Sequence, residues 1–171
     1  MHPFHQLAEH GMEFSLAALD EAHERVATEL ETSSATRLVK ALQMMRLQKA
    51  VLAVGMFSMF EAELQDALAC EDGFREANNR LDAAGEDELK ERFVDLQLAI
   101  NVLKHGRGRS YECLVNRAKQ LPFSVQLHKE NFFHEGDVSE VSTLVDVDNT
   151  FVRGCATAIR EVTAALERQR H

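Results

Sequence analysis

The stretch that decides the fold of this chain is AVLAVGMFSMF, which runs from Ala50 to Phe60. No charged residue interrupts it, and Lys49 and Glu61 bracket its two ends. A run this short cannot span a bilayer as a helix, because that needs about 20 apolar residues. Since it is apolar on every side, it predicts a helical segment buried at the centre of a helical bundle. Gly55 within it leaves room for another helix to approach closely.

Outward from this segment, apolar side chains recur at helical spacing along most of the chain. The clearest pattern is formed by Leu89, Phe93, Leu96, Ile100 and Leu103. Helical segments are expected over about 7–31, 35–70, 74–84, 88–105, 111–120 and 150–170. Only two prolines and no tryptophan occur, a composition that favours helices over strands. We therefore expect an all-α fold, an antiparallel bundle of about four to five helices.

Capping residues and turn signals separate these segments. The hydroxyls of residues 32–34, the hydroxyl of Ser110 and the carboxylate of Asp148 are each placed to cap a following helix. Residues from about 122 to 147 break the helical pattern, and SVQLH and STLVDV within them are typical of short strands. They predict a small hairpin-like insertion before the last helix. No repeat or linker is visible, so residues 1–171 are expected to form a single helical domain.

The loop of this insertion carries several side chains of metal-ligating type. They are His128, Glu130, His134, Glu135 and Asp137. Solvated polar residues on a surface loop are commoner than dedicated ion sites, so we interpret them as surface residues. The chain also lacks a P-loop, a Rossmann glycine pattern and an HExxH motif. We therefore expect neither a metal nor a cofactor.

The formal net charge is −9 and the pI is near 5.4. The electric field of this negative net charge repels phosphate, which argues against a protein that binds nucleic acid or anionic membrane with its whole surface. A local basic patch is still compatible with it. The three cysteines are widely spaced without a CxxC pair, and the N-terminus lacks a signal-peptide pattern. These features predict a soluble, cytoplasmic protein with reduced thiols and no membrane partner.

One local basic patch lies in NVLKHGRGRSYE, from Asn101 to Glu112. It gathers Lys104, His105, Arg107 and Arg109 around the end of a predicted helix. In a structural interpretation, these cations favour the helix C-terminus and the following glycine ends the helix. In a functional interpretation, the turn presents backbone amides and arginines to an anion, and the histidine acts as general acid or base.

The polar residues of the preceding helix support the functional interpretation. Gln97, Asn101 and Lys104 follow a spacing of four and three, so they share one stripe at the edge of the apolar face. His105 lies one step around the helix, which directs it and Asn101 into the same space. The candidate catalytic residues are therefore His105 and Asn101, and the candidate substrate-binding residues are Lys104, Arg107, Arg109 and Ser110.

The stretch INVLKHG resembles the polar motif of the HEPN superfamily, all-helical proteins that carry an Arg followed by a His. It matches the family's Asn, His and Gly at Asn101, His105 and Gly106. The run MFSMFEAELQDAL, from Met56 to Leu68, is similar to the central HEPN helix. The resemblance covers about residues 38–114. It implies an HEPN-like bundle, a homodimer and metal-independent cleavage of RNA by Arg and His residues that face each other across the dimer interface.

The chain departs from this family at one position. The family's Arg directly precedes the Asn, whereas this chain has Ile100, a residue of the apolar stripe. One alternative is an HEPN-like protein that binds RNA or a nucleotide at the basic turn, as a metal-independent endoribonuclease or as an inactive relative. The other is a non-enzymatic helical module that binds a protein partner, with the turn serving only as a helix cap. The sequence leaves both open.

Overall fold

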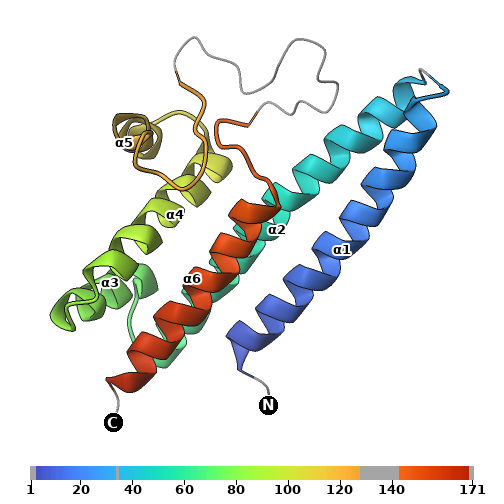
Figure 1. Cartoon of the computed structure of the whole chain (residues 1–171). Helices are drawn as coiled ribbons and strands as arrows, with labels where there is room; N and C mark the ends of the chain where they lie inside the picture. Colours follow the sequence, from blue (N-terminus) through green and yellow to red (C-terminus); the bar gives the residue numbers. More distant parts are fainter. Residues whose placement is uncertain (1–2, 34, 128–142, 170–171) are drawn as a thin grey trace.

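Six α-helices make up most of the computed structural model, which describes residues 3–33, 35–127 and 143–169. They are α1 (Phe4–Leu30), α2 (Thr36–Leu68), α3 (Gly73–Ala83), α4 (Asp87–His105), α5 (Arg109–Arg117) and α6 (Asn149–Arg168) (Figure 1). No β-strand longer than an isolated bridge occurs in these ranges. The predicted all-α fold class is confirmed.

The long helix α2 is the element on which the others assemble. It runs antiparallel to α1, and α6 lies along both helices (Figure 1). The shorter helices α3 and α4 contact α2 and α6 from the side opposite to α1, and α5 packs on α4. Four of the other five helices therefore contact α2.

The core centres on phenylalanine rings of α2, α3 and α4. The ring of Phe93 lies 6.0 Å from the rings of both Phe57 and Phe60 and 5.4 Å from that of Phe74, measured between centroids. The predicted stripe of α4 is buried from Leu89 to Ile100, although Leu103 is only half-buried. One face of α6 is buried as well: Phe151, Cys155, Ile159, Val162 and Leu166.

The central stretch of α2 is not buried on every side, so the prediction for it is wrong on one face. Ala53, Phe57 and Phe60 are buried, but Val51 is 57% exposed and Met59 is 62% exposed. The neighbouring helices cover the other sides of α2 and leave this face open. Despite its apolar run, neither α2 nor any other helix in the described ranges is long and apolar enough to cross a membrane.

The helix ends agree with the capping predictions in part. The Asp148 carboxylate accepts a hydrogen bond of 2.7 Å from the N–H of Phe151, as predicted for the start of α6. By contrast, α2 begins after Ala35 without a side-chain cap, and the Thr32 hydroxyl donates backward to the carbonyl of Glu29. The prediction for residues 32 and 33 is therefore wrong, since the helix starts beyond their reach, and residue 34 lies outside the described residues.

In the described part of the predicted hairpin-like insertion, one antiparallel bridge joins Val125 and Val145. The N–H of Gln126 donates to the carbonyl of Leu144 at 2.9 Å, and the Tyr111 hydroxyl donates to the carbonyl of Gln126 at 2.6 Å. These contacts fasten the two ends of the insertion to α5. The ligand-rich loop of the sequence prediction falls in residues 128–142, outside the described residues.

Candidate functional site

A cavity of about 480 Å³ opens between α2, α3 and α4. Its volume lies within the range of about 300–1,000 Å³ that is usual for small-molecule sites. Its lining is largely polar, with apolar side chains at its base. The lining residues are Phe57, Ser58, Glu61, Asp72, Phe74, Arg75, Asn78, Asn79, Gln97, Ile100, Asn101 and Lys104.

The cavity depends on a close approach of α3 to α2 at Gly73. A Cβ atom at this position would lie 2.7 Å from the carbonyl oxygen of Glu61 and 2.8 Å from the Cβ of Leu64. Both distances are shorter than van der Waals contact, so only glycine fits without a shift of the α2 backbone. The Asp72 carboxylate then caps α3 by accepting a 2.9 Å hydrogen bond from the N–H of Arg75. These two residues place the wall that α3 contributes.

The base of the cavity is aromatic and aliphatic. Phe57 is fully buried, and its ring lies 5.9 Å from that of Phe74, which is half-buried and contributes to the lining. Ile100 is 3% exposed and completes the base from α4. A planar ligand group therefore meets aromatic carbon on one side of the cavity.

Two amide side chains in the wall of the cavity, one from α3 and one from α4, are hydrogen-bonded to each other. The Asn78 amide nitrogen donates a 3.2 Å hydrogen bond to the Gln97 amide oxygen. The remaining polar atoms, Oδ1 of Asn78 and Nε2 of Gln97, are buried and have no protein partner. Exchanging oxygen and nitrogen in both amides leaves the same result, one unpaired acceptor and one unpaired donor. Buried polar atoms are normally hydrogen-bonded, so these are two buried polar atoms of the cavity wall that lack the usual partner.

The charged groups of the lining balance one another in number. Arg75 lies 3.8 Å from the carboxylate of Asp72, which already caps α3. Lys104 is exposed near the C-terminal end of α4, and Glu61 is half-buried on α2. The cavity thus combines a cation at its α4 rim with a carboxylate on its α2 wall.

The structure divides the predicted site residues into two groups. Asn101 and Lys104 line the cavity, as their shared stripe on α4 suggested. His105, the last residue of α4, is exposed and does not belong to the lining. The sequence prediction that His105 and Asn101 share one space is therefore not met by the cavity.

The basic turn after α4 lies outside the cavity lining as well. Gly106 ends α4 with φ 74° and ψ −145°, a conformation with positive φ that favours glycine. The Arg107 guanidinium lies 5.8 Å from the ring centre of Tyr111, within the range of a cation–π contact. Arg109 is exposed and opens α5. Ser110 is half-buried inside α5 and Gly108 is the N-cap residue, so the prediction that Ser110 caps this helix is wrong.

Sequence reasoning missed the contribution of α3 to the site. Asn78 and Asn79 belong to the stretch FREANNR, where two adjacent amides on a short helix were the available signal. Their position against Gln97 depends on how α3 packs on α2 at Gly73 and on α4, which is a tertiary arrangement. No local pattern reports such a contact.

The arginines of a second cavity and a buried carboxylate have ion-pair partners. A second cavity of about 360 Å³ contains Arg92 and Arg153, but these pair with Glu161 and Glu13 at 2.7 and 2.9 Å. Asp95 is the one charged residue fully buried in the described ranges, and Arg117 of α5 lies 3.1 Å from its carboxylate. Burial raises the pKa of Asp95, and the attraction of Arg117 only partly offsets this.

The histidine, cysteine and acidic side chains of the described residues are the next candidates for a site. Among the described residues, no three His, Cys, Asp or Glu side chains are grouped to hold a metal ion. Cys155 is fully buried, which raises the pKa of its thiol, and Cys70 and Cys113 are half-buried.

Comparison of the chain with protein-family models, with curated proteins and with solved structures finds no match.

Proposed function

We propose that this protein binds a nucleotide, free or as part of RNA, with the base in the cavity between α2, α3 and α4. The unpaired donor of Gln97 and the unpaired acceptor of Asn78 carry the proposal. Every nucleobase presents donors and acceptors side by side on one edge, and amide side chains are well suited to pair with such edges. The phenylalanine rings at the base of the cavity supply a surface for stacking.

Lys104 connects this cavity with the basic turn. It lines the cavity and also belongs to the cationic stretch that includes Arg107 and Arg109. A nucleotide with its base against Phe74 then directs its phosphate toward Lys104, which contributes a charge-assisted hydrogen bond. This arrangement needs only a local positive potential, which is compatible with the net charge of −9.

Binding without cleavage is the activity that these side chains favour. Ile100 occupies the position at which the resembling HEPN motif carries Arg, and it is buried in the base of the cavity. His105 is exposed outside the lining, so it lacks a positioned partner for acid–base chemistry at a phosphate bound there. An inactive, nucleotide-binding relative of HEPN proteins accounts for both features.

Calorimetric titration with the four ribonucleoside 5′-monophosphates and a single-stranded oligoribonucleotide tests the proposal. At least one of these ligands should bind, and Lys104→Ala should weaken it by about 10- to 100-fold, the effect of losing a charge-assisted hydrogen bond. Asn101→Ala should weaken it by about fivefold. Lys119→Ala is the matched control, because Lys119 is an exposed lysine beyond the end of α5 that should leave affinity unchanged.

Three outcomes decide between the alternatives. No heat from any ligand at low salt contradicts nucleotide binding and favours a protein-binding module with a structural turn. Weakening by Arg107→Ala and Arg109→Ala but not by Lys104→Ala places binding at the turn instead of the cavity. Cleavage of the oligoribonucleotide that His105→Ala abolishes would show that catalysis persists despite Ile100.

A further inference from the structure

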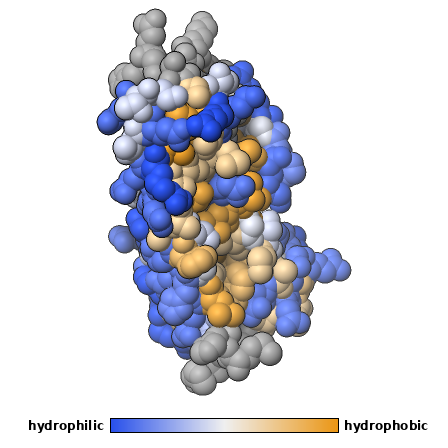
Figure 2. All heavy atoms as spheres, turned by 90° about the vertical axis from the view of Figure 1, so that its right-hand side faces the viewer, coloured by the Kyte–Doolittle hydropathy of each residue, from blue (hydrophilic) through white to orange (hydrophobic). Residues whose placement is uncertain are grey.

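The described residues expose six large hydrophobic side chains, and all six lie on α1 or α2. They are Leu7, Phe14, Met44, Leu47, Val51 and Met59. Figure 2 looks onto the side of these two helices and shows hydrophobic residues in a band along its length, with hydrophilic residues on both borders. Phe14 is 78% exposed and lines a groove between α1 and α2 together with Val51. An exposed apolar band of this kind is typical of a protein interface.

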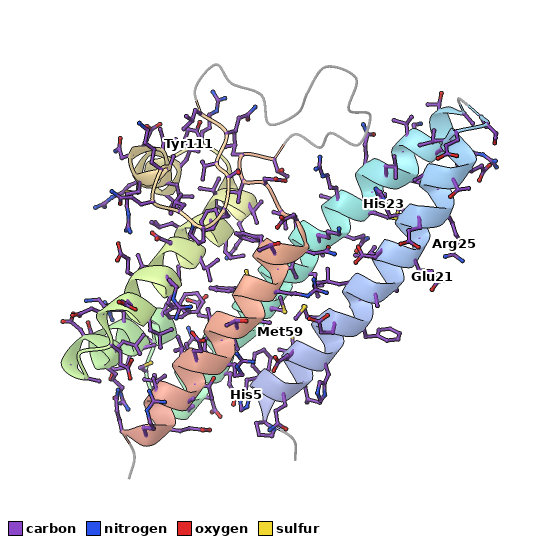
Figure 3. The ribbon with its side chains drawn as sticks, viewed as in Figure 1. His5, Glu21, His23, Arg25, Met59 and Tyr111 are labelled. Carbon is purple, nitrogen blue, oxygen red and sulfur yellow. The ribbon has the colours of Figure 1, made fainter. Side chains whose placement is uncertain are left out.

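On α2 the band forms a regular stripe. Met44, Leu47, Val51, Gly55 and Met59 follow a spacing of three, four, four and four, which keeps them on one side of the helix. Met59 points away from α4 in Figure 3. A Cβ atom at Gly55 would contact nothing within 4 Å, so the helix surface is open there. From Met44 to Met59 the stripe is about 22 Å long, at about 1.5 Å per residue, and glycine lets a partner helix approach near its middle.

The charge of α2 changes sign along its length. Residues 36–50 include four basic residues and no acidic one, whereas residues 51–68 include three acidic residues and no basic one. Exposed Lys40 precedes the apolar stripe, and exposed Glu63 follows it. A parallel second copy of α2 would bring like charges together, while an antiparallel copy places each basic half against an acidic half.

The stripe is also symmetric about one point, between residues 51 and 52. Positions 44 and 59, 40 and 63, and 37 and 66 are each equally far from it along the chain. An antiparallel pair centred there places Met44 on Met59 of the second copy and Lys40 on its Glu63. Leu47 then lies opposite position 56 of the second copy, one residue from the open surface at Gly55. In this one alignment, a second copy of the same chain brings hydrophobic side chains together, pairs opposite charges and places a large side chain near an open surface.

We propose that a second copy of this chain docks on the α1–α2 face, with the two α2 helices antiparallel about a two-fold axis between residues 51 and 52. Both copies use the same surface, so the contact closes into a symmetric dimer. Phe14 lines the same groove as Val51, so one Phe14 flanks the axis on each side. The interface helices are α1 and α2, not α4, which carries the motif that resembles the HEPN site. The dimer does not depend on nucleotide binding.

Sedimentation equilibrium measures the dimer directly. The wild-type chain should form a dimer, and Val51→Glu should produce a monomer with unchanged circular dichroism. Asn116→Glu adds the same charge at an exposed position of α5 and should leave the dimer intact. A wild-type monomer at every concentration up to the millimolar range overturns the proposal, as does a Val51→Glu variant that remains dimeric.

Charge reversal tests the antiparallel orientation. Lys40→Glu and Glu63→Lys should each weaken the dimer by about tenfold or more, because each places like charges together at two symmetric contacts. The double variant exchanges both charges and should recover nearly wild-type affinity. Failure of the double variant to recover, with both single variants weakened, contradicts this orientation.

A cysteine at residue 51 tests the register. Val51→Cys should form an intermolecular disulfide under mild oxidation, since the two copies of residue 51 meet at the axis. Met44→Cys should not, because its two copies lie about 22 Å apart along the pair at about 1.5 Å per residue. The wild-type chain, with its own three cysteines, is the background control. Equal cross-linking of both variants overturns the register.

Discussion

Two neighbouring sides of α2 differ in what they leave without a partner. On the side of α3 and α4, the cavity contains buried amide atoms with no protein partner. On the outer side, Val51 and Met59 expose more than half of their surface to solvent. A buried polar atom without a hydrogen bond costs free energy, and so does exposed apolar surface. The first side is thus suited to a polar ligand and the second to an apolar partner.

The difference arises from how the other helices cover α2. Gly73 brings α3 close enough to form a cavity wall beside Glu61, so this side is enclosed but not filled. On the outer side no helix of the described ranges covers the residues around Val51 and Met59. The same helix therefore provides an enclosed polar site and an open apolar face.

The largest effect is expected in the core beneath the cavity. Phe93 is fully buried and contacts three other phenylalanine rings. Phe93→Ala should lower the free energy of unfolding by about 3–5 kcal/mol, because it removes apolar contacts and leaves a void. Urea denaturation followed by circular dichroism measures this change. A loss below about 1 kcal/mol would contradict the packing of this cluster.

The next largest effect is the difference in stability between alanine substitutions at Gly73, on the enclosed side of α2, and at Gly55, on its open side. Gly73→Ala should destabilise the protein by about 1–3 kcal/mol, because the new Cβ overlaps the α2 backbone. Gly55→Ala should stabilise the monomer by up to about 1 kcal/mol, since its Cβ meets open space inside a helix. Thermal and urea unfolding at dilute concentration compare the two variants. Equal effects of the same sign would contradict the assignment of one enclosed and one open side.

Asp95 makes stability depend on pH. Burial raises its pKa above the ordinary value of 3.8, so the folded state holds this proton more tightly than the unfolded chain. The favourable contribution is fully present below pH 3.8 and is lost as pH rises through the folded-state pKa. Asp95→Asn removes this pH-dependent contribution to stability.

Unfolding of the wild type and of Asp95→Asn should therefore be compared between about pH 3 and 7. As pH rises, the unfolding free energy of the variant should increase relative to that of the wild type. The increase should be about 1.4 kcal/mol for each unit by which the pKa of Asp95 is raised. If the unfolding free energy of the wild type increases relative to that of the variant over the same range, the attraction of Arg117 lowers the pKa of Asp95 by more than burial raises it.

The smallest effect on folding is expected at the outer face. Phe14 is 78% exposed, so Phe14→Ala should change the unfolding free energy of the monomer by no more than about 0.5 kcal/mol. The same substitution should weaken self-association, because it removes apolar area beside the proposed axis. Dilute unfolding and sedimentation measure the two effects separately. A large loss of monomer stability would mean that Phe14 supports the fold and not an interface.

The fold could be predicted where apolar and polar residues alternate at helical spacing. In α4 the stripe from Leu89 to Ile100 identified the buried face, because polar residues between its members defined the exposed one. In α2 the run from Ala50 to Phe60 is apolar throughout, so it contains no such contrast. Which face stays open there depends on the number and placement of neighbouring helices, a tertiary property that local sequence does not contain.

The site could be predicted only in part for a similar reason. Asn101 and Lys104 were found because they share a stripe with Gln97 on one helix, and helical geometry is local. Asn78 was missed because its place beside Gln97 depends on the packing of α3 against α2. His105 lies just beyond Lys104 in sequence, yet its side chain does not belong to the cavity lining.

The side-chain amide resonances of Asn78 and Gln97 in a ¹⁵N-labelled sample test the central claim, that the enclosed side of α2 is the ligand site. Both NH₂ groups can be assigned with Asn78→Asp and Gln97→Glu variants. On titration with a ribonucleoside monophosphate, the NH₂ signals of Asn78 or Gln97 should shift, because the nucleotide accepts a hydrogen bond from the amide nitrogen that has no partner in the protein alone. Unchanged Asn78 and Gln97 signals at saturation, with shifts confined to the turn at Arg107–Arg109, would contradict the account.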